Sequence, residues 1–228
     1  MSINLNKIVL EKSGDAKRIN LAKDSSGKAL SGEITINLNW SQEKVEAKNT
    51  GFLGSLKNMF SGSSAIDLDL GCFYELRNGK KMVIDGIQFA HGKGGTRSQS
   101  SNQGRYTGEP WIWHSGDDRS GGGNGENILL NPLGISELKR MTIYCFIYQG
   151  VANWSQTNAI ASIKVPGNPD IDVEMGKQTS TKMMCALAEI DFDGSEGITV
   201  KKLMSFHNGH SDCDTTYNWG MRWTAGSK

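Results

Sequence analysis

The chain has 228 residues, a formal net charge of +1, 28 glycines and only 4 prolines. This charge balance excludes bulk electrostatic attraction to nucleic acid or to an acidic membrane, so no nucleic-acid partner is expected. No stretch approaches the roughly 18 apolar residues of a transmembrane helix. The first residues lack the apolar core of a secretion signal. The length suits one large β domain or two small ones. The many glycines and few prolines suit a fold with many turns, so we expect an organisation built on strands and turns.

Short alternating segments in the first half of the chain predict strands. Residues 34–40 and 66–72 alternate between apolar and polar side chains, as half-buried strands do. The Asn78-Gly79 pair between residues 73–76 and 82–84 predicts a hairpin with a type I′ turn. Residues 141–148 are apolar on both faces, which indicates a central strand within the core.

The second half of the chain continues the pattern. Strands are predicted at 160–165, where Pro166-Gly167 provides a stop, and at 171–175. A hairpin is predicted from 183–190 and 198–206, and residues 136–140 suggest a single helical turn. Many short strands separated by turn signals predict an all-β fold, a β-sandwich with at most short helices.

Two segments resemble insertions. Residues 41–65 contain an apolar helical face from Phe52 to Phe60, which either docks weakly on a partner or membrane surface or folds back onto the sandwich. Residues 91–108 carry Lys93, Arg97 and Arg105 among polar residues, and form either a phosphate-contacting loop or a solvated one. The expected organisation is one domain over residues 1–228 with these two inserted loops.

The four cysteines, Cys72, Cys145, Cys185 and Cys213, include no Cys-x-x-Cys pair. The first three lie in apolar runs and are expected to be buried free thiols. Such usage is typical of a reducing cytosol, so the expected location is cytoplasmic.

The acidic loop from His114 to Asn127 is the most informative segment. It combines three carboxylates, two Asn amides and five glycines. Carboxylate, amide and carbonyl oxygens are the ligands that Ca²⁺ takes, and glycine lets a backbone curl around an ion. Both the EF-hand pattern and the phosphate-loop ending Gly-Lys-Ser/Thr are absent. The loop is therefore a candidate calcium loop, and the alternative is a solvated turn.

A second acidic pair lies on one predicted strand. Asp67 and Asp69 fall on the same face, opposite Ile66, Leu68 and Leu70. Two carboxylates spaced in this way lie about 6.5–7 Å apart and repel each other unless a positive charge is near. They are positioned to bind one ion or two neighbouring ions, or else to form a polar stripe that faces solvent.

Together these residues resemble the tellurite-resistance family of TerD-like and TerA-like bacterial stress proteins. The resemblance rests on the Asp67-Leu68-Asp69-Leu70 strand and the loop 116–121, with further matches at 3–7, 38–40, 146–154 and 217–223. It implies a calcium-binding β-sandwich with a role in resistance to tellurite, phage or colicins and no established catalysis. The family loop commonly ends Gly-Asp-Asp-Glu, whereas this loop ends Gly125-Glu126-Asn127 and carries less negative charge there.

The expected cofactor is therefore Ca²⁺, in a binding or scaffold module that is not an enzyme and whose partners are other proteins of the stress system. The expected metal ligands are Asp67, Asp69, Asp117, Asp118 and Glu126, with Asn124 and Asn127 as weaker oxygen donors.

Two other kinds of site remain open. In a metal-dependent phosphoester hydrolase the same carboxylates would hold Mg²⁺ or Mn²⁺, with His114 as the candidate general base. His207, His210 and Cys213 also have a spacing that a zinc site can use, although the run around them resembles a turn.

Overall fold

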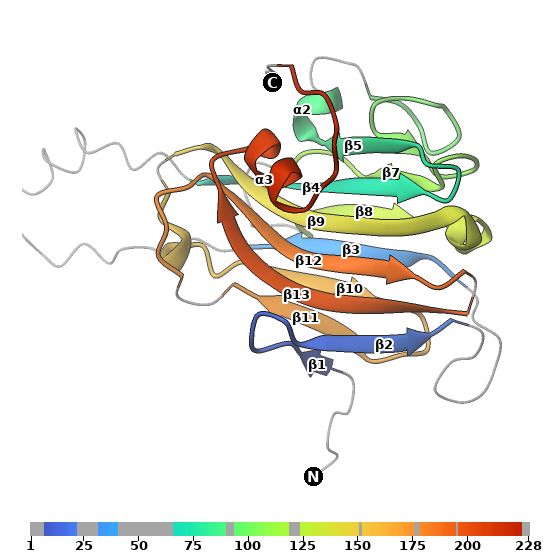
Figure 1. Cartoon of the computed structure of the whole chain (residues 1–228), viewed down its shortest axis with the longest axis horizontal. Helices are drawn as coiled ribbons and strands as arrows, with labels where there is room; N and C mark the ends of the chain where they lie inside the picture. Colours follow the sequence, from blue (N-terminus) through green and yellow to red (C-terminus); the bar gives the residue numbers. More distant parts are fainter. Residues whose placement is uncertain are drawn as a thin grey trace, which may run out of the picture.

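Two β-sheets pack face to face across an apolar core, and this arrangement confirms the predicted all-β sandwich (Figure 1). The computed structural model describes residues 7–21, 32–40, 66–89, 94–118, 124–150, 152–175, 178–194 and 196–224. None of the helices in this part of the chain has the length and apolarity needed to span a membrane.

The first sheet has seven strands in the order β1-β11-β10-β3-β8-β7-β6. Their bounds are β1 Lys7–Val9, β11 Asp170–Glu174, β10 Ile160–Lys164, β3 Ile34–Asn39, β8 Glu126–Leu130, β7 Ile112–His114 and β6 Gly104–Arg105.

The second sheet has six strands in the order β2-β13-β12-β9-β4-β5. Their bounds are β2 Ala16–Asn20, β13 Gly197–His207, β12 Met184–Phe192, β9 Leu138–Gln149, β4 Asp67–Leu76 and β5 Lys81–Asp85. The helical elements are short: α2 Gly86–Phe89, η1 Pro132–Glu137, η2 Trp154–Gln156 and α3 His210–Thr216.

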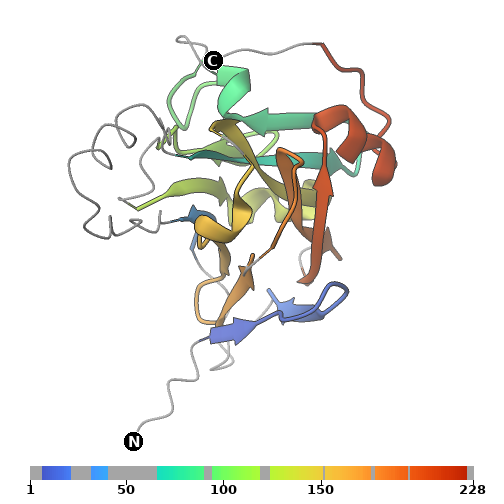
Figure 2. The same ribbon diagram turned by 90° about the vertical axis from the view of Figure 1, so that its left-hand side faces the viewer.

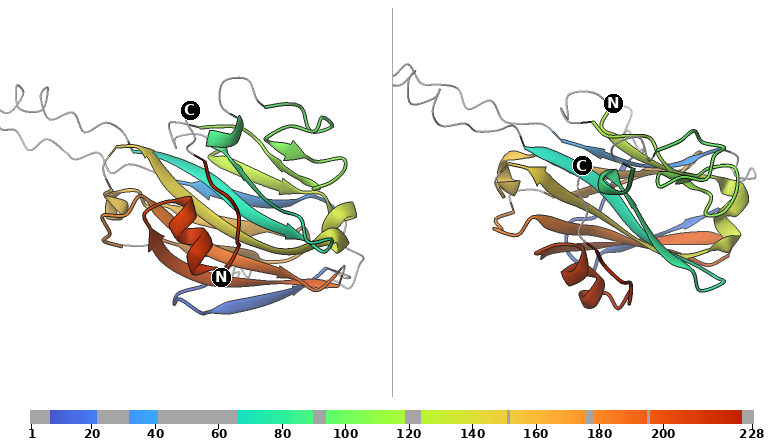
Figure 3. Two further views of the ribbon diagram at one scale, coloured as in Figure 1. Left: turned by 45° about the horizontal axis from the view of Figure 1, so that its top comes forward. Right: turned by 90° about the horizontal axis from the view of Figure 1, so that it is seen from above.

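Alternation along the strands separates two apolar clusters. On β4, Leu68 and Leu70 point into the main core between the sheets, together with residues such as Ile36 of the opposite sheet. Phe73, on the other face of β4, joins a second cluster with Trp219. Helix α3 and the segment after it cover this outer face of the six-stranded sheet (Figures 2 and 3).

The first two strands belong to different sheets, because β1 pairs in parallel with β11 and β2 pairs with β13. Lys202 of β13 holds the place where the chain crosses from β1 in one sheet to β2 in the other. Its buried ammonium donates hydrogen bonds to the carbonyls of Leu10, Glu11 and Glu174 at 2.9, 3.1 and 3.0 Å. Burial lowers the pKa of Lys202, and all three ammonium donors have an acceptor.

The predicted β4–β5 hairpin is present, but the predicted type I′ turn is wrong. Leu76 and Lys80 form the last pair, so the loop holds three residues, Arg77 to Gly79. Of these only Gly79 has a positive φ, +89°. A type I turn followed by a left-handed glycine closes a three-residue loop, whereas type I′ closes a two-residue loop.

The helical turn predicted at 136–140 is also misplaced. The 3₁₀ turn η1 ends at Glu137, and β9 starts at Leu138. Asn131 accepts the Leu133 N–H at 3.0 Å and Pro132 follows it, so the turn begins at its cap instead of at the charged residues.

Of the two inserted segments, residues 41–65, including the Phe52–Phe60 face, lie outside the described residues. The second segment is described from Gly94 onward and contains β6. Its Arg97 stacks on Tyr106 and Trp113, with ring centroids at 5.1 and 5.5 Å, and pairs with Glu33 at 3.0 Å. This guanidinium is therefore engaged by the protein itself.

Candidate metal centre

The site lies where β4 extends beyond the end of its neighbouring strand, β5. β5 ends at Asp85, which pairs with Gly71, so Leu70 has no strand beside it on that side. Two side chains of the seven-stranded sheet take the place of the missing strand. Glu126 Oε2 accepts the Leu70 N–H at 2.7 Å, and His114 Nε2 lies 3.0 Å from the Leu70 carbonyl. An otherwise unpaired buried backbone is satisfied in this way.

The hydrogen bonds of His114 define its tautomer. The Gly116 N–H donates to Nδ1 at 3.2 Å, so Nδ1 is the acceptor and Nε2 carries the proton. Nε2 then donates to the Leu70 carbonyl and lies 3.5 Å from Glu126 Oε2. The His114 and Glu126 side chains are fully buried. Nε2 of His114 therefore holds β4, and Nδ1 holds the backbone that follows β7.

Glu126 also positions the acidic loop. Its second oxygen, Oε1, accepts the Asp118 N–H at 3.0 Å. One carboxylate thus ties together the edge of β4 and the backbone that follows β7. Charge-assisted bonds of this kind are about twice as strong as neutral ones. The consequence is that Asp117 is held beside the start of β4.

Three carboxylates converge at this place. Asp67, Asp69 and Asp117 each offer one oxygen, and these oxygens all lie within 4.8 Å of one another. Asp69 is fully buried, Asp67 is 5% exposed, and Asp117 is exposed. Two oxygens that share a Ca²⁺ at about 2.4 Å lie no more than about 4.8 Å apart, so the donor set and its spread fit one Ca²⁺.

The remaining predicted ligands are placed nearby but are engaged differently. Both oxygens of Glu126 accept backbone hydrogen bonds. Asn127 Oδ1 accepts from the Asn37 amide at 2.9 Å, and the same amide donates to the Asn124 carbonyl at 2.8 Å. Asp118 is half-buried and contributes its N–H to Glu126. The structure therefore brings three of the seven predicted ligands together as side-chain donors.

A second buried carboxylate, Asp85, was missed by sequence reasoning. Its Oδ2 accepts from Tyr144 at 2.6 Å and lies 2.9 Å from His210 Nε2, while Oδ1 accepts two N–H groups of α2. Burial opposes ionisation of Asp85, but the bonds and charge of His210 outweigh it and lower the pKa of this carboxyl. Gly71 makes room for this arrangement, because a Cβ there would lie 2.4 Å from the Tyr144 ring.

The proposed zinc set is separated by these contacts. His210 faces Asp85, and His207 Nε2 is 2.8 Å from the Ser205 hydroxyl. Burial raises the pKa of Cys213 to about 12, which keeps the thiol protonated. Among the described residues, the aspartate trio is the one group of His, Cys, Asp or Glu close enough to hold a metal. All four cysteines are free and buried, which confirms the expectation for Cys72, Cys145 and Cys185.

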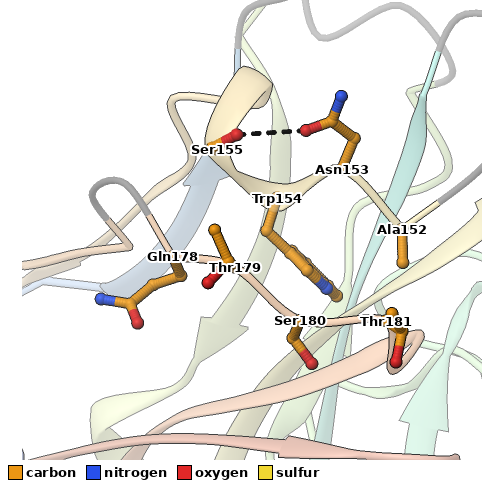
Figure 4. A pocket seen from close by; sticks show the side chains of 8 residues that line it. All are labelled: Ala152, Asn153, Trp154, Ser155, Gln178, Thr179, Ser180 and Thr181. Carbon is orange, nitrogen blue, oxygen red and sulfur yellow. Dashed lines mark hydrogen bonds between the residues drawn. The ribbon is translucent and has the colours of Figure 1, made fainter.

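A polar pocket of about 480 Å³ lies where the chain leaves β9 (Figure 4). Its side chains are uncharged, with hydroxyls from Ser155 and Thr181 and an amide from Asn153 among them. Trp154 is buried behind it and donates to the Lys182 carbonyl at 2.8 Å. Because no carboxylate lines it, this pocket adds no charged ligand to the metal centre.

Comparison with known proteins agrees with the acidic motifs. The chain is 36% identical, over 228 residues and 99% of its length, to "Tellurium resistance protein TerA" from Alcaligenes sp. This confirms the resemblance to the TerD/TerA-like tellurite-resistance family. The chain spans 60% of that TerA protein. No protein-family model matches the sequence.

A solved structure gives information on the fold of this chain alone. The crystal structure of a protein of unknown function, SAV2460, superposes with a TM-score of 0.50 at 16% identity. The match covers 78% of this chain and 90% of that one. At this identity the likeness concerns the sandwich and gives no information on its ligands or activity.

Proposed function

We propose that this protein is a calcium-binding stress-response protein, linked to resistance against tellurite and related stresses, that acts as a binding module. The observation that carries the proposal is the convergence of Asp67, Asp69 and Asp117 within 4.8 Å. Without a cation these carboxylates repel one another, and burial of two of them increases the cost. Backbone carbonyls and water would have to supply the rest of the six to eight oxygens that Ca²⁺ takes.

The bound ion would connect the two layers. Asp67 and Asp69 belong to the six-stranded sheet, whereas Asp117 follows β7 of the seven-stranded sheet. Ordering this end of the sandwich would create a surface for other proteins of the same stress system, since loops at the end of a sandwich commonly carry recognition. Buried free thiols fit a reducing compartment, so we propose a cytoplasmic location.

The alternative, a metal-dependent phosphoester hydrolase, needs a general base beside an open coordination position. The sequence candidate for that base was His114. Its Nδ1 accepts from Gly116 and its Nε2 donates to Leu70, so neither nitrogen is directed at a water on the metal. This geometry favours binding over hydrolysis.

The test is calorimetric titration of metal-stripped protein with Ca²⁺ and with Mg²⁺, combined with thermal melting. Ca²⁺ at about 100 times its Kd should stabilise the fold by roughly 2.7 kcal/mol. Asp117→Asn should weaken Ca²⁺ binding at least tenfold, while Asp191→Asn, at an exposed position outside the trio, should leave it unchanged. Absence of binding heat together with an unchanged melting temperature contradicts the calcium proposal.

The scaffold role has its own test. Proteins captured from a lysate in calcium should differ from those captured in chelator, and Asp117→Asn should reproduce the chelator pattern. Turnover of a phosphoester by the wild-type protein that is lost in Asp117→Asn would instead establish the hydrolase.

A further inference from the structure

β5 is a border strand with an open side. It pairs with β4, and no other strand of the described residues lies next to it in the six-stranded sheet. The border is at the upper side of the sheet in Figure 1. In the strand order of the other sheet, β6 is also a border strand. An unpaired strand edge presents a row of backbone donors and acceptors to any extended segment.

The alternation of hydrogen-bonded pairs between β4 and β5 identifies which backbone groups of β5 point away from β4. The Leu76 N–H donates to the Lys80 carbonyl at 2.9 Å, so Leu76 and Lys80 form a hydrogen-bonded pair. Alternation then makes Tyr74 with Met82 the next such pair along the strands. The N–H and C=O groups of Lys81 and Val83 therefore point away from β4, and no described residue hydrogen-bonds to them.

Hollows lie on both faces of this edge. On the outer face, a hollow of about 550 Å³ is lined by Met82, Val83, Met221 and Trp223. On the inner face, a hollow of about 330 Å³ is lined by β5 and by residues 100–102, 104, 109 and 110. Met82 is 47% exposed between them. Successive side chains of an added strand would enter the two hollows alternately.

The open edge of β5 and the two hollows beside it form a groove, and the residues that line this groove determine which kind of segment it can bind. Because segments around 100–110 and 220–224 line the hollows on either side of β5, the groove fits one extended strand better than the border of another folded sheet. Its lining holds three cations, Lys80, Lys81 and Arg222, against one carboxylate, Glu109, which pairs with Lys80 at 2.9 Å. The remaining positive charge favours an acidic segment.

We propose that β5 binds an extended acidic segment of a partner protein as an added strand. The segment's backbone pairs with Lys81 and Val83. An apolar side chain enters the hollow beside Met221 and Trp223, and carboxylates two residues away, on the same face of the added strand, meet Lys81 and Arg222. This surface is independent of the aspartate trio, so its failure in a test and the failure of calcium binding are separate results.

The first experiment measures binding of a labelled seven-residue peptide to the wild-type protein by fluorescence anisotropy. The peptide has a central leucine, an aspartate two residues to either side of it and threonine at the other positions, so that leucine and both aspartates share one face of the added strand. Two further peptides carry N-methyl groups on every second amide, and the methylated amides of one peptide are the unmethylated amides of the other. The peptide whose methylated amides point away from β5 should bind like the parent. The peptide whose methylated amides point toward β5 should bind about tenfold more weakly or worse, because these amides can no longer donate to β5. Equal binding of the two methylated peptides, or no saturable binding of the parent, overturns the proposal.

The second experiment changes the protein. Val83→Pro removes an outward N–H that β4 does not use, and proline is tolerated at such edge positions. It should weaken peptide binding about tenfold, whereas Val83→Thr, which keeps the N–H, should not. Arg222→Glu should weaken the aspartate peptide and strengthen one with lysine in place of aspartate.

Two outcomes of the second experiment contradict the proposal. One is a folded Val83→Pro variant that binds like wild type. The other is a concentration-dependent dimer of the wild type in sedimentation that Val83→Pro dissociates, because the groove would then serve a second copy. If Val83→Pro does not fold, the methylated peptides on the wild-type protein still decide the question.

Discussion

Replacing Glu126 by glutamine separates two roles for this residue, calcium ligand and clamp on β4. The side chain is fully buried, and its oxygens accept from Leu70 at 2.7 Å and from Asp118 at 3.0 Å. Glutamine has one oxygen and one NH₂ group at these places. In Glu126→Gln one of the two backbone N–H groups therefore faces another donor.

The expected loss of folding free energy in Glu126→Gln follows from these two hydrogen bonds. Losing one charge-assisted bond and leaving a buried N–H unsatisfied costs about 2–4 kcal/mol. For a chain of this length the melting temperature then falls by about 4–16 °C. The measurement is urea and thermal unfolding in excess chelator, so that no metal contributes. Glu137→Gln, at an exposed position, is the matched control and should change the melting temperature by less than about 2 °C.

Asp117→Asn provides the contrasting result, since it should leave metal-free stability unchanged or raise it by relieving repulsion. If Glu126→Gln unfolds like wild type in chelator but no longer gains stability from Ca²⁺, Glu126 is a ligand and the clamp reasoning is wrong.

Two further predictions concern the Asp85 cluster. Gly71→Ala should destabilise the protein by about 1–3 kcal/mol, because its Cβ would lie 2.4 Å from the Tyr144 ring; unchanged denaturant unfolding would refute this. Asp85→Asn should destabilise the fold at neutral pH. Because the folded pKa of Asp85 is lowered, the stabilisation is fully present above the ordinary pKa of about 3.9 and is lost as the pH falls through the folded value. The stability gap between wild type and Asp85→Asn should thus narrow as the pH falls below about 4, and a gap that is the same at about pH 2 as at about pH 5 would contradict the assignment.

Local pattern predicted the strands well, because alternation records which face is buried. The segments at 34–39 and 184–192 and the all-apolar run of β9 all appear as strands. Asp67, Asp69 and Asp117 were identified as candidates because acidic residues on a strand and in a glycine-rich loop are visible in sequence.

The roles of individual acidic residues were not visible in the same way. A carboxylate that binds a cation and one that caps a strand edge have the same local signature, so Glu126 was grouped with the ligands. Asp85 was missed because its partners Tyr144 and His210 lie 59 and 125 residues away along the chain. Only the pairing of β9 and β5 on opposite sides of β4, with α3 over the outer face of this sheet, brings these three side chains together.

The position of β1 and β2 has a consequence for how the chain is made. These strands are synthesised early, yet their partners are β11 and β13, and Lys202 closes the crossing between them. At about 5–20 residues per second, roughly 10–40 s of translation separate the early strands from those partners. Throughout that interval two β segments have no sheet to join. Nascent-chain arrest before residue 202 should therefore leave the amino-terminal strands sensitive to protease and available to chaperones, and release of the full chain should protect them.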